Sequence, residues 1–397
     1  MNMTNIATDS NLEKIAIVVV GYNRLKSIQR LISSLLLADY KGDNVPLVIS
    51  IDYSGDEKLY EYVKQVEWPF GEKYVNIQEV RLGLKQHIYQ CGDLTQYFKA
   101  IILLEDDLFV SPYFYNYVRQ TLNKYGENEQ IAQISLYKNE TNGYASFPFL
   151  NLQTGSDVFL MQDVSTWGEC WNHKMWTKFK HWRDSVCTDE LIQSAQMPYQ
   201  IKQWGRAWSK YYNAYVSSKD LFCIYPNVSL TTNFSDAGEH GSDNTSAVQN
   251  SLLYYNSELR LPEVKELPSY DGFFNNLLLY SYLQLTPEEC LLDIYGIREY
   301  NNLSQKYILT TRKLNLELIK SYGLCMRPIE ENVRYQIPGD GIRLYKINSK
   351  EFGIGEYLPN FIDYHLRHMN MRELTKYVFR HYLEALKRRL KIRNAKK

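Results

Sequence analysis

Four short apolar runs, each followed by a helical pattern, constrain the fold of the first part of the chain. The runs cover residues 15–20, 46–51, 75–80 and 101–104. Each is bounded by polar residues and has the length of one buried strand. Strands that alternate with helical segments predict βαβ units and a parallel sheet. We therefore expect an α/β fold with a mainly parallel central sheet.

The fourth apolar run ends in three consecutive carboxylates, Glu105, Asp106 and Asp107. In an open α/β sheet, ligands bind at the carboxyl ends of such strands. Three acidic side chains at one strand end repel each other, and a Mg²⁺ or Mn²⁺ ion shared with substrate phosphates would balance them. A solvated acidic turn is the alternative, and the triplet by itself leaves both open.

Polar residues also follow the other three strands. Arg24 comes after the first, Asp52 after the second, and Lys85 and His87 after the third. These side chains and the acidic run would converge on one rim of the sheet, a geometry that suits a nucleotide diphosphate. The chain has neither GxGxxG after its first strand nor GxxxxGK[ST] anywhere, which argues against a dinucleotide oxidoreductase and a P-loop enzyme.

Length and cysteine usage bound the class of protein. A chain of 397 residues suits two or three domains, and we expect divisions at 1–255, 256–368 and 369–397. The six cysteines form no CxxC pair, as is usual for reduced thiols in a cytosolic protein. The start of the chain lacks the apolar region of a signal peptide, and no segment approaches the roughly 20 apolar residues of a membrane span. We expect a cytoplasmic protein.

The zero net charge hides a basic C-terminal segment. Residues 370–397 carry ten lysines and arginines against Glu373 and Glu384, so this tail has a charge of +8 and the rest of the chain −8. Five apolar residues repeat at four-residue steps: Leu374, Val378, Tyr382, Leu386 and Leu390. A basic amphipathic helix commonly lies on an anionic membrane surface. A nucleic-acid patch and a partner-binding helix are the alternatives; we expect the membrane, and no nucleic acid.

Six of the seven tryptophans lie between residues 167 and 208. Large aromatic side chains dominate the energetics of protein cores, so the cluster predicts a second core. The same rings could instead form a platform for a sugar ring, whose apolar faces pack against aromatics.

Several segments together resemble a known group, the GT-A glycosyltransferases, and most closely the N-acetylglucosaminyltransferase I type and its bacterial relatives. The resemblance covers roughly residues 14–250 and rests on these segments: Val19–Arg24, Asp52, Leu82–His87, Leu104–Leu108, Tyr225–Phe234 and Gly238–Ser242. It implies a Rossmann-like domain that binds a nucleotide sugar, followed by an accessory region and the basic helix.

The resemblance also implies roles for particular residues. Asp107 would be the direct metal ligand, and Glu105 and Asp106 would lie against the ribose and sugar of the donor. Asp52 and His87 would contact the uracil, and Arg24 would contact the nucleotide. Lys85 or His240 would add a positive contact to the diphosphate. Residues 235–245 would close over the donor and exclude water. An ordinary loop histidine is the alternative for His240.

An inverting transfer needs a base that takes the proton from the acceptor hydroxyl. In the related enzymes the base is an aspartate in a tryptophan-rich segment after the acidic triplet. Asp184, in Trp182-Arg183-Asp184, fits that description here, with Glu169 second. The basic neighbour Arg183 departs from the acidic one that the family pattern has, and an exposed helix carboxylate is the alternative for Asp184.

The expectation is therefore a metal-dependent hexosyl- or N-acetylhexosaminyltransferase that uses a nucleotide sugar, with UDP as the nucleotide. Its acceptor would be a glycan or a lipid-linked glycan, in surface polysaccharide biosynthesis at the inner face of the membrane. Inversion rests on the resemblance alone. Two alternatives remain: a nucleotidyltransferase on a similar scaffold, which usually has a glycine-rich loop unlike Gly21–Arg24, and a protein that binds nucleotide sugars without turnover.

Overall fold

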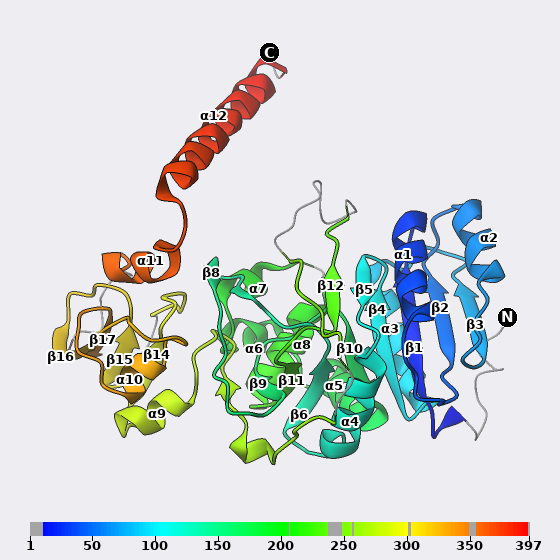
Figure 1. Ribbon diagram of the computed structural model, residues 1–397, viewed down its shortest axis with the longest axis horizontal. Helices are drawn as coiled ribbons and strands as arrows, with labels where there is room; N and C mark the ends of the chain where they lie inside the picture. The colour runs from blue at the N-terminus through cyan, green and yellow to red at the C-terminus, as the bar shows by residue number, and fades with distance from the viewer. Residues whose placement is uncertain are drawn as a thin grey trace. The chain divides into compact units, whose positions relative to one another are not determined.

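The protein divides into two compact units in the computed structural model (Figure 1). The structure describes residues 11–205, 207–236, 248–255, 258–300, 303–348 and 355–395. Unit 1 is formed by Met1–Leu278 with Ile297–Glu299, and unit 2 by Leu279–Gly296 with Tyr300–Lys397.

A nine-stranded sheet is the centre of unit 1. In spatial order its strands are β13 (Ser269–Tyr270), β9 (Val158–Met161), β11 (Phe222–Pro226), β6 (Ile131–Ser135), β10 (Glu169–Asn172), β4 (Ala100–Glu105), β1 (Ile15–Gly21), β2 (Leu47–Ile51) and β3 (Lys73–Ile77). Five neighbouring pairs are parallel, and the three antiparallel pairs all involve β9 or β10. The prediction of an α/β fold with a mainly parallel central sheet is confirmed.

Strands β1, β2 and β4 are buried along nearly their whole length, as expected for parallel strands covered on both faces. The third strand begins and ends earlier than the predicted 75–80, and its residues are all half-buried. It lies at the edge of the sheet, where one side has no neighbouring strand to cover it.

Helices connect and cover these strands. They are α1 (Leu25–Leu36), α2 (Glu57–Gln65), α3 (Leu84–Gly92), α4 (Phe114–Tyr125), α5 (His173–Ser185), α6 (Asp189–Ser194), α7 (Tyr199–Gln203) and α8 (Trp208–Ser218). Helix α9 (Leu278–Leu283) leads into unit 2. Two short ladders complete unit 1: β5 (Leu108–Val110) pairs with β12 (Thr231–Asn233), and β7 (Thr141–Asn142) with β8 (Phe147–Pro148).

Four of the six clustered tryptophans belong to the core. Trp171, Trp176, Trp182 and Trp208 are buried where α5 packs against α8, β6 and β10. Trp171 lies 5.0 Å from Trp176 and 5.7 Å from Trp208, measured between ring centroids. The core interpretation is confirmed for these four, whereas Trp167 is half-buried and Trp204 is exposed.

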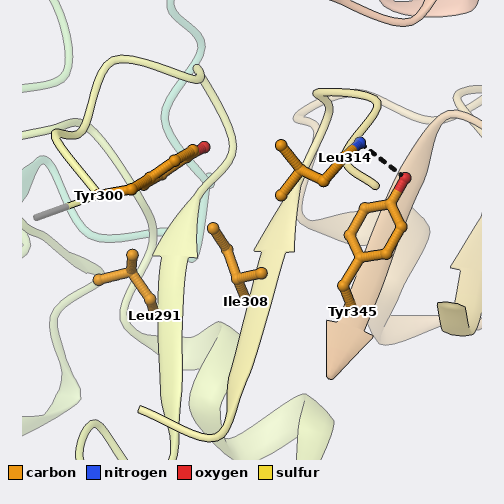
Figure 2. Close-up of a cluster of buried hydrophobic side chains, with 5 residues drawn as sticks. All are labelled: Leu291, Tyr300, Ile308, Leu314 and Tyr345. Atoms are coloured by element: carbon orange, nitrogen blue, oxygen red, sulfur yellow. Dashed lines mark hydrogen bonds between the residues drawn. The ribbon is translucent and has the colours of Figure 1, made fainter. Parts of the chain in front are cut away.

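Unit 2 contains a four-stranded sheet in the order β14 (Cys290–Asp293), β15 (Tyr307–Thr310), β17 (Ile342–Lys346) and β16 (Glu317–Tyr322), with α10 (Glu331–Arg334) and α11 (Pro359–Leu366). Figure 2 shows its small core of Leu291, Tyr300, Ile308, Leu314 and Tyr345. The Tyr345 hydroxyl accepts a hydrogen bond from the backbone N–H of Leu314 at 3.3 Å.

The boundary expected at residue 255 falls inside unit 1, because β13 adds to the edge of the nine-stranded sheet after that point. The expected regions 256–368 and 369–397 fall largely within unit 2. Their division by function stays a prediction.

The last helix, α12, spans Met371–Ala395. Among its described side chains, seven large hydrophobic ones are exposed: Met371, Tyr377, Val378, Phe379, Tyr382, Leu383 and Leu386. None of the helices within the described ranges is long and apolar enough to cross a membrane.

Candidate active site

Strands β1 and β4 end side by side, and this brings two predicted site segments together. Val20 pairs with Glu105 in the parallel ladder. Arg24, just past β1, donates through Nε to Asp106 Oδ2 at 3.2 Å and through Nη1 to Asp107 Oδ2 at 3.3 Å. The third nitrogen of the same guanidinium, Nη2, donates to the other oxygen of Asp106, Oδ1. The expected convergence of Arg24 and the acidic run is therefore present.

One carboxylate oxygen of Asp107 has no partner among the described residues. Its Oδ2 accepts from Arg24, whereas Oδ1 is buried and has no partner in the part of the chain that the structure describes. A buried acceptor without a partner carries a desolvation cost of about 1–3 kcal/mol, so such an atom calls for a ligand. A divalent cation is one ligand that satisfies it.

The donor set around Asp107 suits Mg²⁺ or Mn²⁺ only if substrate completes the coordination. No group of three or more His, Cys, Asp or Glu side chains that could hold a metal ion occurs among the described residues. Mg²⁺ is usually bound through one or two carboxylates together with waters and substrate phosphates, rather than by a dedicated protein cage. The free oxygen of Asp107 fits that pattern.

A further carboxyl group, that of the buried Glu169, lies beside Glu105 of the acidic run. Glu169 is the first residue of β10, which enters the sheet between β4 and β6, and neither of its carboxyl oxygens has a partner within the described ranges. Burial, followed by the charges of Asp107 and Asp106, raises the pKa of Glu105 to about 8. Burial and the charge of Glu105 raise the pKa of Glu169 well above its ordinary value. Both effects favour the protonated form of Glu169 over the carboxylate.

The strand that leads toward residues 235–245 is attached to the acidic run. Strand β12 pairs with β5, which directly follows Asp107 (Figure 1). The backbone N–H of Phe234 donates to the carbonyl of Asp107 at 2.9 Å, and Arg24 Nη1 donates to the carbonyl of Asp236 at 3.1 Å. Hydrogen bonds thus connect the acidic run with Arg24 and with residues 234–236.

Asp236 belongs to the predicted closing segment, residues 235–245, although the sequence indicated no role for this residue by itself. Its carboxylate accepts from Ser27 Oγ at 2.7 Å and from Arg30 Nη1 at 3.3 Å, both on α1. These charged hydrogen bonds lower the pKa of Asp236 against the effect of its partial burial. The remainder of the predicted closing segment, including His240, lies outside the described residues.

Asp52 lies at the same edge of the sheet, where its carboxylate is used by the backbone. It accepts from the N–H groups of Tyr53 at 2.9 Å, Leu82 at 2.8 Å and Gly83 at 2.9 Å. These bonds fix the turn that precedes α3, in which Gly83 has a positive φ of 77°. The contact of Asp52 with uracil stays a prediction.

His87 and Lys85 also contact protein groups. His87 is 1% exposed, and its Nε2 lies 2.7 Å from Ser50 Oγ. Burial lowers the pKa of His87 to about 4, so the ring is neutral at pH 7. The Lys85 ammonium lies 4.8 Å from the ring centroid of Tyr211. The predicted nucleotide contacts of both residues remain untested.

Asp184 lies at the end of α5 and is exposed. Arg183 Nε donates to its Oδ1 at 2.6 Å, and this ion pair lowers the pKa of Asp184. The Arg183 guanidinium in turn lies 4.2 Å from the ring centroid of Tyr89. These are the contacts of the exposed helix carboxylate considered as the alternative, and the role of Asp184 as a base stays a prediction.

Comparisons with known proteins give weak likenesses of fold. No family model matches the chain, and no curated protein matches its sequence. Three solved structures are similar in fold: TarS residues 1–349 of S. aureus with UDP-GlcNAc, the mannosyltransferase PcManGT of Pyrobaculum calidifontis with GDP-Man and Mn²⁺, and GalNAc-T7 with UDP, GalNAc and Mn²⁺. Their identities to this chain are 12%, 10% and 14%, with TM-scores of 0.37, 0.32 and 0.36.

In the same order, the matches cover 57%, 54% and 55% of this chain. They cover 60%, 55% and 43% of the three other chains, so this chain spans less than two thirds of the length of each of them. At these TM-scores the likenesses carry no argument about this protein. The finer resemblance, to the N-acetylglucosaminyltransferase I type, stays a prediction.

Proposed function

We propose that this protein is a metal-dependent glycosyltransferase that takes its sugar from a nucleotide-sugar donor. The observation that carries the proposal is the carboxylate of Asp107 at the end of β4: Arg24 holds one oxygen, and the other is buried and unpartnered among the described residues. A Mn²⁺ or Mg²⁺ ion bound there would stabilise the charge that develops on the leaving diphosphate.

The residues around Asp107 would prepare the site for such a donor. Arg24 fixes the orientation of Asp106 and Asp107, so the free oxygen is positioned before any ligand arrives. The charges of Asp106 and Asp107 act on the carboxyl group of Glu105, so a cation bound here would offset the repulsion within the acidic run.

We propose UDP as the nucleotide and a hexose or N-acetylhexosamine as the sugar, with inversion at the anomeric carbon. These choices come from the sequence resemblance. Asp184 and Glu169 remain the candidates for the base. Glu169 would first have to lose its proton, which a cation bound at Asp107 would favour, because a nearby positive charge lowers a carboxyl pKa.

For the acceptor we propose a glycan or lipid-linked glycan in surface polysaccharide biosynthesis, used at the cytoplasmic face of the membrane. The C-terminal segment supports this location, because α12 exposes large hydrophobic side chains and residues 370–397 are strongly basic. Basic residues near an anionic leaflet contribute about 1 kcal/mol each.

Calorimetric titration of UDP tests the donor site, with and without Mn²⁺, on the wild type and on Asp107→Asn. We expect binding that requires the metal and is lost in the variant. The control is Asp189→Asn, the same change at an exposed aspartate in the first turn of α6. Binding that ignores the metal and survives Asp107→Asn would contradict the proposal. A donor-consumption assay with any acceptor then separates an enzyme from a non-catalytic binding protein.

A further inference from the structure

A pocket in unit 1 is lined mainly by aromatic and uncharged polar side chains, unlike the acidic run. Its volume is about 360 Å³, within the lower range for small-molecule sites. Five aromatic side chains line it: Tyr137, Tyr144, Trp167, Trp204 and Phe274. We call it the aromatic pocket.

The two tryptophans of the cluster that are not in the core both line this pocket. Trp204 follows α7 and is 36% exposed. Trp167 is half-buried, and its ring packs edge-on against Tyr137 at 4.6 Å between centroids. A sugar ring has an apolar face as well as polar hydroxyl groups. Aromatic rings that line a pocket provide an apolar surface on which that face can pack.

Asp163 supplies the pocket with a buried carboxylate. Its Oδ1 accepts from the Tyr144 hydroxyl at 2.7 Å, and its Oδ2 accepts from Asn139 Nδ2 at 3.2 Å. An ionised carboxylate has about four acceptor positions, so these bonds leave capacity for a ligand hydroxyl. Asp163 therefore provides an oriented acceptor next to the aromatic walls.

The charge of the aromatic pocket selects against phosphates. Among the described residues that line it there is no Lys, Arg or His, and Asp163 is the charged one. An anionic ligand would be repelled by Asp163 and would find no counter-charge among the described residues that line the pocket. The pocket thus suits an uncharged polyhydroxyl ligand, whereas Arg24 and the free Asp107 oxygen suit a metal and a diphosphate.

A short stretch of chain links this pocket to the acidic run. Ser165, Thr166 and Trp167 line the pocket, and the carbonyl of Trp167 accepts from the Thr231 hydroxyl on β12. Two residues later Glu169 places its carboxyl beside the acidic run. The aromatic pocket is therefore directly continuous along the chain with the candidate active site.

We propose that the aromatic pocket is a subsite for the acceptor and that it holds one uncharged sugar ring of a glycan. This proposal rests on the proposed glycosyltransferase function. It assigns Trp204 and Trp167 to stacking on the ring and Asp163 to accepting hydrogen bonds from its hydroxyls.

Saturation-transfer NMR on the full chain tests the proposal without any donor. The probes are the methyl pyranosides of glucose, galactose, mannose, N-acetylglucosamine and N-acetylgalactosamine, with glucuronic acid and glucose 6-phosphate as charged comparators. We expect at least one neutral pyranoside to bind and the charged comparators to fail. Trp204→Ala should weaken that binding by about tenfold, the equivalent of roughly 1.4 kcal/mol.

The matched control is Tyr199→Ala, which removes a 50% exposed aromatic ring from α7, the short helix that precedes Trp204, at a position outside the pocket lining. Asp163→Asn is the second variant and should also weaken binding. The proposal is overturned if no neutral pyranoside binds the wild type, if a charged comparator binds equally well, or if Trp204→Ala binds like the wild type.

The outcomes for the two sites can be told apart with Asp107→Asn. If that variant loses UDP but still binds the sugar, both assignments stand. Sugar binding in a wild type that ignores UDP and Mn²⁺ would keep the aromatic pocket as a sugar site and remove the transferase function. UDP binding with no sugar binding would leave the donor site and remove the aromatic pocket.

Discussion

Replacing Asp52 by Asn separates a structural role from a role in binding. In the structure the Asp52 carboxylate is 4% exposed and accepts three backbone N–H bonds. The Asn side chain keeps one oxygen, which can still serve Tyr53 and Leu82. Its amide NH₂ replaces Oδ2 and cannot accept from Gly83.

The expected cost follows from that lost bond. An unsatisfied buried donor costs about 1–3 kcal/mol, and Gly83 is only half-buried, so the lower half of the range applies. Loss of the negative charge also weakens the two bonds that remain. We expect Asp52→Asn to lower the free energy of unfolding by about 1–2 kcal/mol.

Urea unfolding measures the stability, and hydrogen exchange of the Leu82 and Gly83 amides reports the turn itself. Both amides should exchange faster in Asp52→Asn and stay unchanged in Asp189→Asn. If the urea midpoint and the exchange rates are unaffected while UDP affinity falls, the structural reasoning is refuted and the predicted uracil contact is favoured.

Three other predictions address different parts of the molecule. Arg24→Met leaves the buried carboxylate of Asp106 without its partner, so thermal unfolding should show a loss of about 3 kcal/mol, at the low end for a broken buried ion pair. Burial lowers the pKa of His365 in α11 to about 4 from 6.5, so only the unfolded state takes up this proton between those values, and stability should fall as pH drops through this window. His87 contributes a similar pH dependence, so His365→Phe should reduce the pH slope of stability between about pH 4.5 and pH 7 by up to about 1.4 kcal/mol per pH unit, and an unchanged slope in that variant contradicts the assignment. The double variant Phe379→Ser with Leu383→Ser should reduce sedimentation with anionic phosphatidylserine vesicles, and equal sedimentation would argue against the membrane role of α12.

The parallel core of the sheet could be predicted because its strands are continuous apolar runs that alternate with helices. The meeting of Arg24 with the acidic run followed from the same pattern, since residues after neighbouring parallel strands share an edge. The position of β10 could not be predicted. Its four residues carry no strand signal of their own, and pairing with β4 and β6 depends on contacts distant in sequence.

The parts of the site that were missed depend on tertiary contacts. Asp236 is held by Ser27 and Arg30, which are more than 200 residues away along the chain. Asp163 comes just after the apolar strand β9, but that strand runs antiparallel to β11, and Asp163 is positioned by Tyr144 and Asn139. The sequence alone indicates neither these contacts nor those of Asp236.

The register of β10 restricts insertions and deletions in the connection that precedes this strand. Because Glu169 begins the strand and Trp171 lies on the same face two residues later, one register fixes both the site and the tryptophan core. A one-residue change in the length of the connection between β9 and β10 that shifted this register would turn both side chains to the opposite face. This connection should therefore tolerate substitutions far better than changes in length.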